Sequence, residues 1–344
     1  MPARRTCATM PLHRHLAAVD AGYRAARRGI ETFSMLARRR PRTTVARIPA
    51  VVHVLYRTAA ENIEATQVQS QIDVLNADFR ARNADVDKVP DAFSARVGDA
   101  LIEFALATED PDGRKSDGIT RTRTRRKSFG GDIASLDEEI KVASGAAAWP
   151  ADRYLNLWVC SLGEGLLGYA QFPGGPADRD GIVVLNTAFG TTGIVEAPFD
   201  RGRTATHEVG HWQNLLHIWG DDDLGCRGSD SVGDTPNQAG SNGGCPKFPR
   251  VSCANGPHGD MFMNYMDYTD DACMCLFTRG QVTRMHAALA GPRAGIVAGE
   301  DGAEPIVRFG ATGADAGSPG AVPPAEEGSE PELVFDGVDW VEPS

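Results

Sequence analysis

Three histidines and one glutamate within eleven residues set the strongest limit on how this chain can fold. They lie in the stretch His207-Glu208-Val-Gly-His211-Trp-Gln-Asn214-Leu-Leu-His217. His207 and His211 are four residues apart, so on a helix they stand on one face about one turn apart, where two imidazoles can bind one metal ion. His217 cannot join them on a straight helix, because ten helical residues rise about 15 Å and a Zn–N bond is about 2 Å long. The helix must therefore end after His211, and the chain must turn back.

Asn214 occupies the position at which we expect this turn. The extended histidine motif has Gly there, and Asn is among the few other residues that tolerate the left-handed backbone. Glu208 follows the first histidine and can act as general base toward a metal-bound water. The chain contains eight histidines, so a chance match to this spacing has odds of about one in a few thousand. We predict a zinc ion held by His207, His211 and His217, with Glu208 as the catalytic base.

Hydrophobic periodicity predicts alternating strands and helices before this motif. Such alternation favours a mixed, largely parallel sheet. Residues 119–131 are rich in Arg and Gly and suggest a surface loop, and residues 220–277 show little periodicity. Helices are expected at 65–82 and 278–294, and strands at 48–56, 102–108, 154–160, 168–172 and 181–185.

The two ends of the chain carry opposite charge. Residues 1–48 hold eleven arginines and two acidic residues, and residues 300–344 hold eleven acidic residues and one arginine. We expect a detachable segment at 1–47 with a helix over 12–37, a catalytic domain at 48–295 divided near 217, and a disordered acidic tail at 296–344. The body between these ends is moderately acidic, which argues against nucleic-acid binding.

Cysteine usage indicates an oxidising compartment. Five of the seven cysteines fall between residues 226 and 275, in Gly- and Pro-rich sequence, and no C-x-x-C pair suggests a zinc ribbon. The first 30 residues lack the apolar stretch of a signal peptide, and no apolar run is long enough to span a membrane. A start further upstream or another export route would reconcile these features, and we predict secretion.

A second motif brings a family resemblance. The string Met263-Asn-Tyr-Met266-Asp-Tyr268, together with the zinc motif, resembles the pappalysin-type metzincin metallopeptidases, which include ulilysin-like bacterial members. The resemblance covers roughly residues 48–290. It implies an α+β metzincin-like fold: an N-terminal subdomain with a twisted five-stranded mixed sheet, a backing helix and the active-site helix, then an irregular C-terminal subdomain with a Met-turn and a final helix.

The same resemblance assigns roles near the metal. Met266 would form the apolar floor of the Met-turn beneath the site, and the Tyr268 hydroxyl would steady the transition state. Protein or peptide substrates would add antiparallel to an exposed sheet edge. Our candidate edge is Gly168, Tyr169 and Ala170, and we expect a monomer.

Disulfides and calcium are also implied by the family pattern. It suggests the pairs Cys226–Cys253 and Cys245–Cys273, with Cys275 as an extra thiol. The loop from Ser229 to Thr235 resembles a family calcium loop, in which carboxylates and carbonyls supply six to eight oxygen ligands. Asp230, Asp234 and Thr235 are the candidate calcium ligands.

The basic head suggests latency. A thiolate is a good zinc ligand, so Cys7 could fill the open metal position as a cysteine switch. Residues 38–47 would then be the exposed cleavage segment, and since ulilysin-like enzymes tend to cut before Arg, self-cleavage is plausible.

These features together predict a secreted zinc-dependent endopeptidase. Two alternatives keep the zinc site: a protease toxin with one narrow target, and a non-peptidase zinc hydrolase such as an amidase. A zinc-stabilised binding module is disfavoured, because a pure scaffold needs neither Glu208 nor Tyr268.

Overall fold

A single mixed sheet forms the centre of the molecule. The computed structural model describes residues 4–37, 42–163, 165–222, 225–297, 334–335 and 340–341. The strands follow the order β2-β1-β4-β6-β5, and only β5, at the edge, runs antiparallel to its neighbour. The predicted mixed, largely parallel sheet is confirmed. The strands are β1 (Ala46–Tyr56), β2 (Ile102–Leu106), β3 (Ile119–Arg123), β4 (Leu155–Cys160), β5 (Gly168–Ala170) and β6 (Ile182–Leu185).

The sheet has six strands in five positions, because β2 and β3 share one side of the long strand β1. β2 pairs with residues 46–50 of β1 and β3 with residues 52–56. The expected surface loop at 119–131 was therefore wrong in its first part. β3 has the sequence Ile-Thr-Arg-Thr-Arg, in which β-branched residues alternate with arginines. The strand is only half buried, and its arginines led to the prediction of a surface loop.

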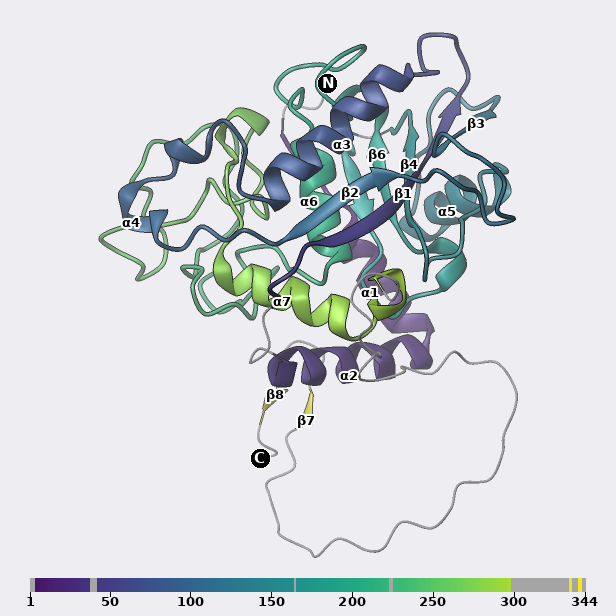
Figure 1. Ribbon diagram of the computed structural model, residues 1–344. Helices are drawn as coiled ribbons and strands as arrows, with labels where there is room; N and C mark the ends of the chain where they lie inside the picture. The colour runs from purple at the N-terminus through teal and green to yellow at the C-terminus, as the bar shows by residue number, and fades with distance from the viewer. Residues whose placement is uncertain are drawn as a thin grey trace, which may run out of the picture. The chain divides into compact units, whose positions relative to one another are not determined.

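Helices cover both faces of the sheet (Figure 1). One face packs against α3 (Ala65–Phe79) and α6 (Arg203–Trp212), the helix that carries His207 and His211, in a core that also includes Val52 and Val54 of β1. The other face packs against α5 (Ile133–Glu138) through Leu55 and Trp158. Burial on both faces explains why β4 and β6 are almost continuously apolar.

The C-terminal part of the body is irregular, as predicted, until α7 (Arg279–Ala290). A capping box begins α7: the Thr278 hydroxyl accepts from the Gln281 amide, and the Gln281 side chain accepts from the Thr278 amide. Short elements complete the fold: η1 (Val86–Lys88), α4 (Asp91–Ser94), η2 (Glu139–Ala143), η3 (Ala177–Arg179), η4 (Asn186–Ala188), η5 (Asp271–Cys273) and η6 (Ala294–Val297).

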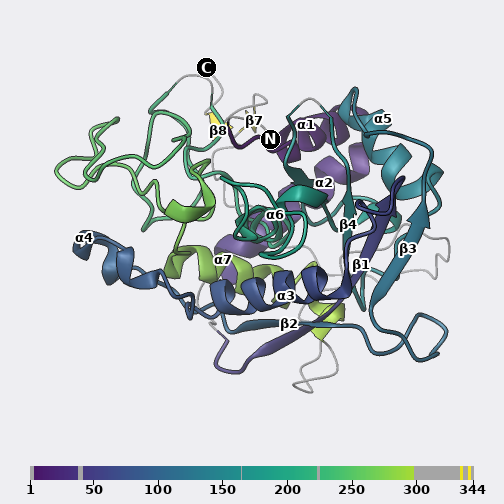
Figure 2. The same ribbon diagram turned by 90° about the horizontal axis from the view of Figure 1, so that it is seen from above.

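The N-terminal segment forms two helices, α1 (Thr9–Val19) and α2 (Ala21–Ala37), where a single helix over 12–37 was predicted. Asp20 has an extended backbone, and its carboxylate accepts a hydrogen bond from the amide of Tyr23, so it ends α1 and caps α2. Both helices pack on the body, and Figures 1 and 2 show α2 running beside α7.

No helix in the described residues is long and apolar enough to cross a membrane. The compact unit that contains the sheet spans Met1–Phe309, and a second unit spans Gly310–Ser344. In the second unit, β7 (Val334–Phe335) and β8 (Trp340–Val341) form an antiparallel pair. Most of the predicted acidic tail, and cleavage-segment residues 38–41, lie outside the described residues.

Candidate metal centre

The three histidines of the motif converge on one point. The Nε2 atom of His207 lies 3.2 Å from that of His217, and the Nε2 atom of His211 lies 3.2 Å from His207 and 3.1 Å from His217. A tetrahedral metal with bonds of about 2.0–2.1 Å needs its ligand atoms roughly 3.3 Å apart. The spacing therefore fits a zinc ion, and the Cys7 sulfur joins the same cluster as a possible fourth ligand.

Each histidine is oriented by a hydrogen bond from its other ring nitrogen. The Nδ1 atoms of His207 and His211 lie 2.7 Å from the backbone oxygens of Tyr265 and Leu215. The Nδ1 atom of His217 instead faces the carboxylate of Asp221. With Nδ1 donating, every Nε2 is left as a lone-pair donor for a metal. Burial and the neighbouring imidazoles also lower the pKa values of His207 and His211, which favours neutral rings.

The turn after α6 forms at the position expected from the sequence. α6 ends at Trp212, and Asn214 has φ of 71°, in the left-handed region. The chain then folds back, so that His217 reaches the two helical histidines although it follows His211 by six residues. Two arginines support this turn: Arg293 donates to the Trp212 carbonyl at 2.7 Å, and Arg284 donates to the Asn214 carbonyl at 2.5 Å.

Glu208 lies beside the histidines, and its carboxylate accepts hydrogen bonds from residues of the N-terminal segment. Its Oε2 atom accepts hydrogen bonds from the Thr9 hydroxyl at 3.1 Å and the Cys7 thiol at 3.3 Å. Burial raises the pKa of Glu208 to about 8. Burial and the adjacent Glu208 likewise raise the pKa of Cys7, so a thiolate there needs a cation beside it.

Residues 6–8 lie along the edge strand β5 in the parallel direction. The amide of Ala8 donates to the Gly168 carbonyl, and the amide of Leu167 donates to the Thr6 carbonyl. The side chain of Thr9 completes the contact by accepting from the Ala170 amide at 2.8 Å. Gly168 allows the edge strand to lie against Glu208, because a Cβ atom at this position would lie 3.1 Å from the Glu208 Cγ. Tyr169 of the same edge points into the protein and is fully buried.

Met266 and Tyr268 flank the histidines. A Cβ atom at Gly210 would lie 2.5 Å from the Met266 sulfur, so the glycine of the motif makes room for the methionine beneath α6. The Tyr268 ring centroid lies 4.9 Å from that of His217 and 5.7 Å from that of His207. Met266 therefore lies against α6, and Tyr268 lies beside two of the histidine rings.

A buried pocket for a guanidinium was missed by the sequence analysis. Arg5, two residues before Cys7, is 2% exposed. Its guanidinium pairs with Asp271 at 2.5 Å and donates to the Thr204 hydroxyl at 3.0 Å and the Thr269 carbonyl at 3.3 Å. The second Asp271 oxygen accepts from the amides of Arg201 and Arg203, which hold the carboxylate in place. Two sequence features could have indicated this pocket: an arginine two residues before Cys7 and an acidic residue three residues after Tyr268.

The three candidate calcium ligands divide into two groups. The Asp230 carboxylate accepts hydrogen bonds from the Thr235 hydroxyl at 2.8 and 3.0 Å, and burial raises the pKa of Asp230 to about 7. Asp234 instead accepts from the Thr278 hydroxyl and the Gly280 amide at the start of α7.

Two disulfides stabilise the irregular part of the body. Cys226 is bonded to Cys253 and Cys245 to Cys273, the same pairs that the family resemblance implied. Cys160 is a free thiol buried in β4, and Cys275 is also free and buried.

Comparisons with known proteins show which family the chain resembles. The family model of pregnancy-associated plasma protein-A peptidases (peptidase M43) matches residues 137–290. An extracellular metalloprotease of Verticillium alfalfae is 32% identical over 250 residues, which cover 70% of this chain and 76% of the relative. Extracellular metalloprotease 1 of Coccidioides posadasii is 41% identical over 181 residues, which are 51% of this chain and 61% of that relative's length.

Solved structures match a larger share of the chain. A promirolysin mutant of Tannerella forsythia has a TM-score of 0.78 and 46% identity, and the match covers 85% of this chain and 97% of that one. Mature mirolysin of the same organism, in complex with a cleaved peptide, has a TM-score of 0.71 and 51% identity, over 75% of this chain and 97% of that chain.

Proposed function

The chain belongs to the pappalysin family of peptidases (peptidase M43) and is an extracellular metalloendopeptidase; from that premise we propose that His207, His211 and His217 bind a catalytic zinc ion beside the general base Glu208. The observation that carries this proposal is the convergence of three Nε2 atoms within 3.2 Å of one another. Three neutral nitrogens leave zinc with one position for substrate or water.

When bound, the zinc ion supplies a Lewis acid that acidifies water and polarises the scissile carbonyl. The side chains of the protein perform the remaining steps. Glu208 accepts the proton of the attacking water and passes it to the leaving amine. The Tyr268 hydroxyl donates a hydrogen bond to the developing oxyanion, and Met266 supports the histidines from below.

We further propose that substrate binds to the edge strand β5, at Gly168, Tyr169 and Ala170, antiparallel to it. The N-terminal segment runs parallel to β5, so its polarity is the reverse of that of a substrate. Residues before Cys7 therefore occupy the side of the cleft where substrate residues after the scissile bond would lie. The Asp271 pocket that holds Arg5 on that side supports cleavage before a basic residue, with arginine preferred for its planar fork.

Residues 1–47 act as an inhibitory segment in this proposal. Cys7 lies in one cluster with the three histidines and would take the remaining position of a bound zinc ion, and Thr9 and Cys7 both donate hydrogen bonds to the Glu208 carboxylate. The reversed polarity of residues 6–8 protects them from cleavage, so activation would require cleavage elsewhere, within 38–47. The catalytic domain would then begin near residue 48 and end near 295.

A structural calcium ion is the second cofactor that we propose. Asp230 is 4% exposed and the Thr235 hydroxyl lies beside it. The charge of Arg284 acts on this carboxylate, but in the described residues no hydrogen bond or ion pair joins the two. A buried carboxylate of this kind is stabilised by a divalent cation. Asp234 would support the calcium loop indirectly, by fixing the start of α7.

The test is proteolysis of casein by the chain from about residue 48 onward, separated from residues 1–47, with and without a chelator, beside a Glu208→Ala variant. We expect cleavage that the chelator abolishes and that added zinc restores. The variant should bind zinc and cleave nothing, because Glu208 is not a ligand. Undiminished cleavage by the variant would refute the assignment of Glu208, and cleavage in chelator at full rate would refute the zinc site.

A further inference from the structure

The second helix of the N-terminal segment is held on the body by contacts that do not involve the metal centre. Every third or fourth residue of α2 is buried, and these residues form one stripe on the helix: Tyr23, Arg27, Ile30 and Ser34. This stripe faces α7 and the turn that follows α6.

Two glycines of the body shape the surface under the stripe. A Cβ atom at Gly174 would lie 3.0 Å from the Ile30 Cδ1, and one at Gly291 would lie 2.6 Å from the Phe33 ring. The Arg27 guanidinium lies over the Phe172 ring at 4.8 Å. A side chain at either glycine would press against a side chain of α2, so the body surface is fitted to this helix.

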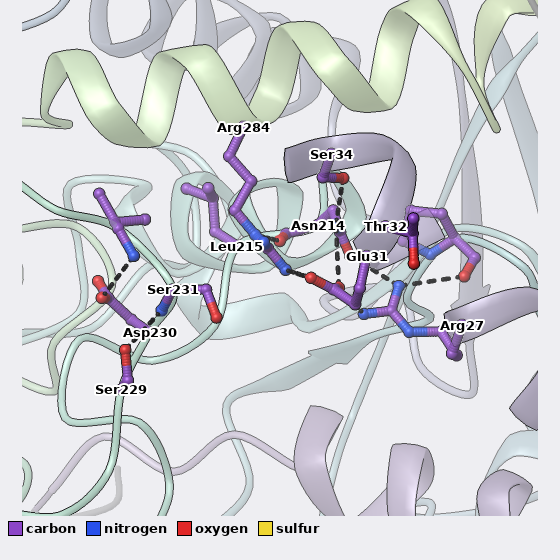
Figure 3. A network of polar contacts seen from close by, with 12 residues as sticks. Arg27, Glu31, Thr32, Ser34, Asn214, Leu215, Ser229, Asp230, Ser231 and Arg284 are labelled. Atoms are coloured by element: carbon purple, nitrogen blue, oxygen red, sulfur yellow. Dashed lines mark hydrogen bonds and ion pairs between the residues drawn. The ribbon is translucent and has the colours of Figure 1, made fainter. Parts of the chain in front are cut away.

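A buried polar network forms the centre of the contact (Figure 3). Arg284 of α7 donates to both oxygens of Glu31 at 2.7 Å, while its Nε donates to the Asn214 carbonyl. Arg27 donates to the Asn214 side chain at 2.6 Å and to Glu31 at 2.9 Å. The amide nitrogen of Asn214 faces Glu31 and Ser34 at 3.3 and 3.4 Å.

In the described residues the body gives Arg284 no ion-paired carboxylate, although Asp230 of the body interacts with it electrostatically. Arg284 and Arg293 both donate to carbonyls at the end of α6, but Arg293 forms a bidentate pair with Asp180 of the body. In the described part of the chain, the ion pair of Arg284 is with Glu31 of α2, and Arg284 is 2% exposed. Departure of α2 would leave this guanidinium without its carboxylate.

We propose that the surface formed by Phe172, Gly174, Asn214, Arg284 and Gly291 is a docking site for α2 that outlasts cleavage of the chain. We call it the α2 site. Residues 1–37 then stay bound after cleavage within 38–47, and full activity needs a second step that removes them. The ligand that the site recognises is an amphipathic helix with one carboxylate at the position of Glu31, and recognition does not require Cys7.

The inhibition that follows from this retention rests on the proposed function, but the binding itself does not. Binding can therefore be measured without any peptidase activity. Failure of the casein assay would reject the proposed function, whereas loss of the cleaved segment would reject only the present proposal.

The experiment uses the full chain with the recognition sequence of a specific protease in place of residues 38–41. After folding and cleavage, size-exclusion chromatography and native mass spectrometry show whether residues 1–37 remain with the body. We expect retention for the unmodified chain and for Cys7→Ser. The Glu31 side chain is 34% exposed, but its partner Arg284 is buried. Removing the partner of a buried charge weakens binding, so Glu31→Gln should dissociate at least about tenfold more readily.

Two neighbouring arginines provide a matched control. Arg27 is buried in the network, and Arg28 is exposed on the same helix. Arg27→Gln should release the segment, and Arg28→Gln should retain it. Equal retention of the two variants, or prompt release of the unmodified segment, would overturn the proposal.

A second measurement avoids any folding defect of a variant. A synthetic peptide of residues 9–37, which lacks Cys7, is titrated into the unmodified body after its own segment has been removed. We expect saturable binding that weakens at least about tenfold when the peptide carries Glu31→Gln. Equal binding of the two peptides would show that Glu31 and Arg284 do not decide recognition.

Discussion

The Nδ1 atom of His217 lies 2.5 Å from the Oδ1 atom of Asp221, whereas His207 and His211 direct the same atom to backbone carbonyls. One of the three candidate zinc ligands is therefore polarised by a carboxylate. Such a partner fixes the tautomer and the orientation of the ring, so that its other nitrogen faces the metal. Asp221 itself follows His217 by four residues, on the part of the chain that has just turned back.

We predict that Asp221→Asn weakens zinc binding by about 10- to 100-fold, the usual effect of losing such a partner. Competition with a chromophoric chelator measures this change. Asp178→Asn is the control, because Asp178 is an exposed aspartate of η3. Equal zinc affinity of the two variants would show that Asp221 does not tune the site.

Tyr268→Phe should lower kcat about 100-fold and leave KM nearly unchanged. The hydroxyl is proposed to meet the oxyanion, which exists only in the transition state, and losing one such donor commonly costs about that factor. Steady-state kinetics on a short peptide substrate separate the two constants, and zinc content serves as the control. A variant whose KM rises while kcat stays constant would place Tyr268 in substrate binding.

Asp271→Asn should remove the preference for arginine after the scissile bond. Asparagine keeps the shape that accepts the amides of Arg201 and Arg203 but loses the charge that pairs with a guanidinium. We expect the ratio of kcat/KM for an arginine peptide to that for its citrulline analogue to fall at least about tenfold.

Asp270→Asn is the neighbouring control, since the hydrogen bonds of the Arg5 guanidinium go to Thr269, Thr204 and Asp271, and Asp270 acts on Arg5 only through its charge. An unchanged preference in Asp271→Asn would mean that the Arg5 pocket is not the substrate pocket.

The stability of the calcium loop should depend on pH through Asp230. Burial raises the pKa of this carboxyl from 3.8 to about 7. Without calcium, the Asp230 carboxyl of the folded state keeps its proton between about pH 4 and pH 7, whereas that of the unfolded state has lost it. The stability that this protonated carboxyl contributes is therefore fully present at low pH and is lost as pH rises through 7. The shift corresponds to about 4 kcal/mol at most.

Thermal unfolding of the unmodified chain and Asp230→Asn, at about pH 5 and pH 8, tests this linkage. In chelator, the stability of the unmodified chain relative to the variant should fall at the higher pH. Calcium should reverse the trend, because it binds the deprotonated carboxylate. A calcium effect of the same size at both pH values in both proteins would exclude Asp230 as a ligand.

Much of the site followed from local spacing. Helical periodicity placed His207 and His211 on one face, and Asn214 marked the turn because it tolerates positive φ. The buried strands were recognised because a strand covered on both faces must be apolar along its length. Local sequence patterns gave a wrong prediction where packing overrode them. The arginines of β3 indicated a loop, but the segment forms a strand because it pairs with the long strand β1.

The amino-acid sequence alone determined which residues could bind a metal, where helix α6 ends and which strands are buried. These features depend on repeats of two or 3.6 residues along the backbone. The tertiary structure alone decided that Arg5 meets Asp271, 266 positions away, and that Glu31 meets Arg284, 253 positions away. Pairs so distant leave no periodic trace in the sequence. They arise only when the N-terminal helices pack against the completed body and bury charges that then require partners.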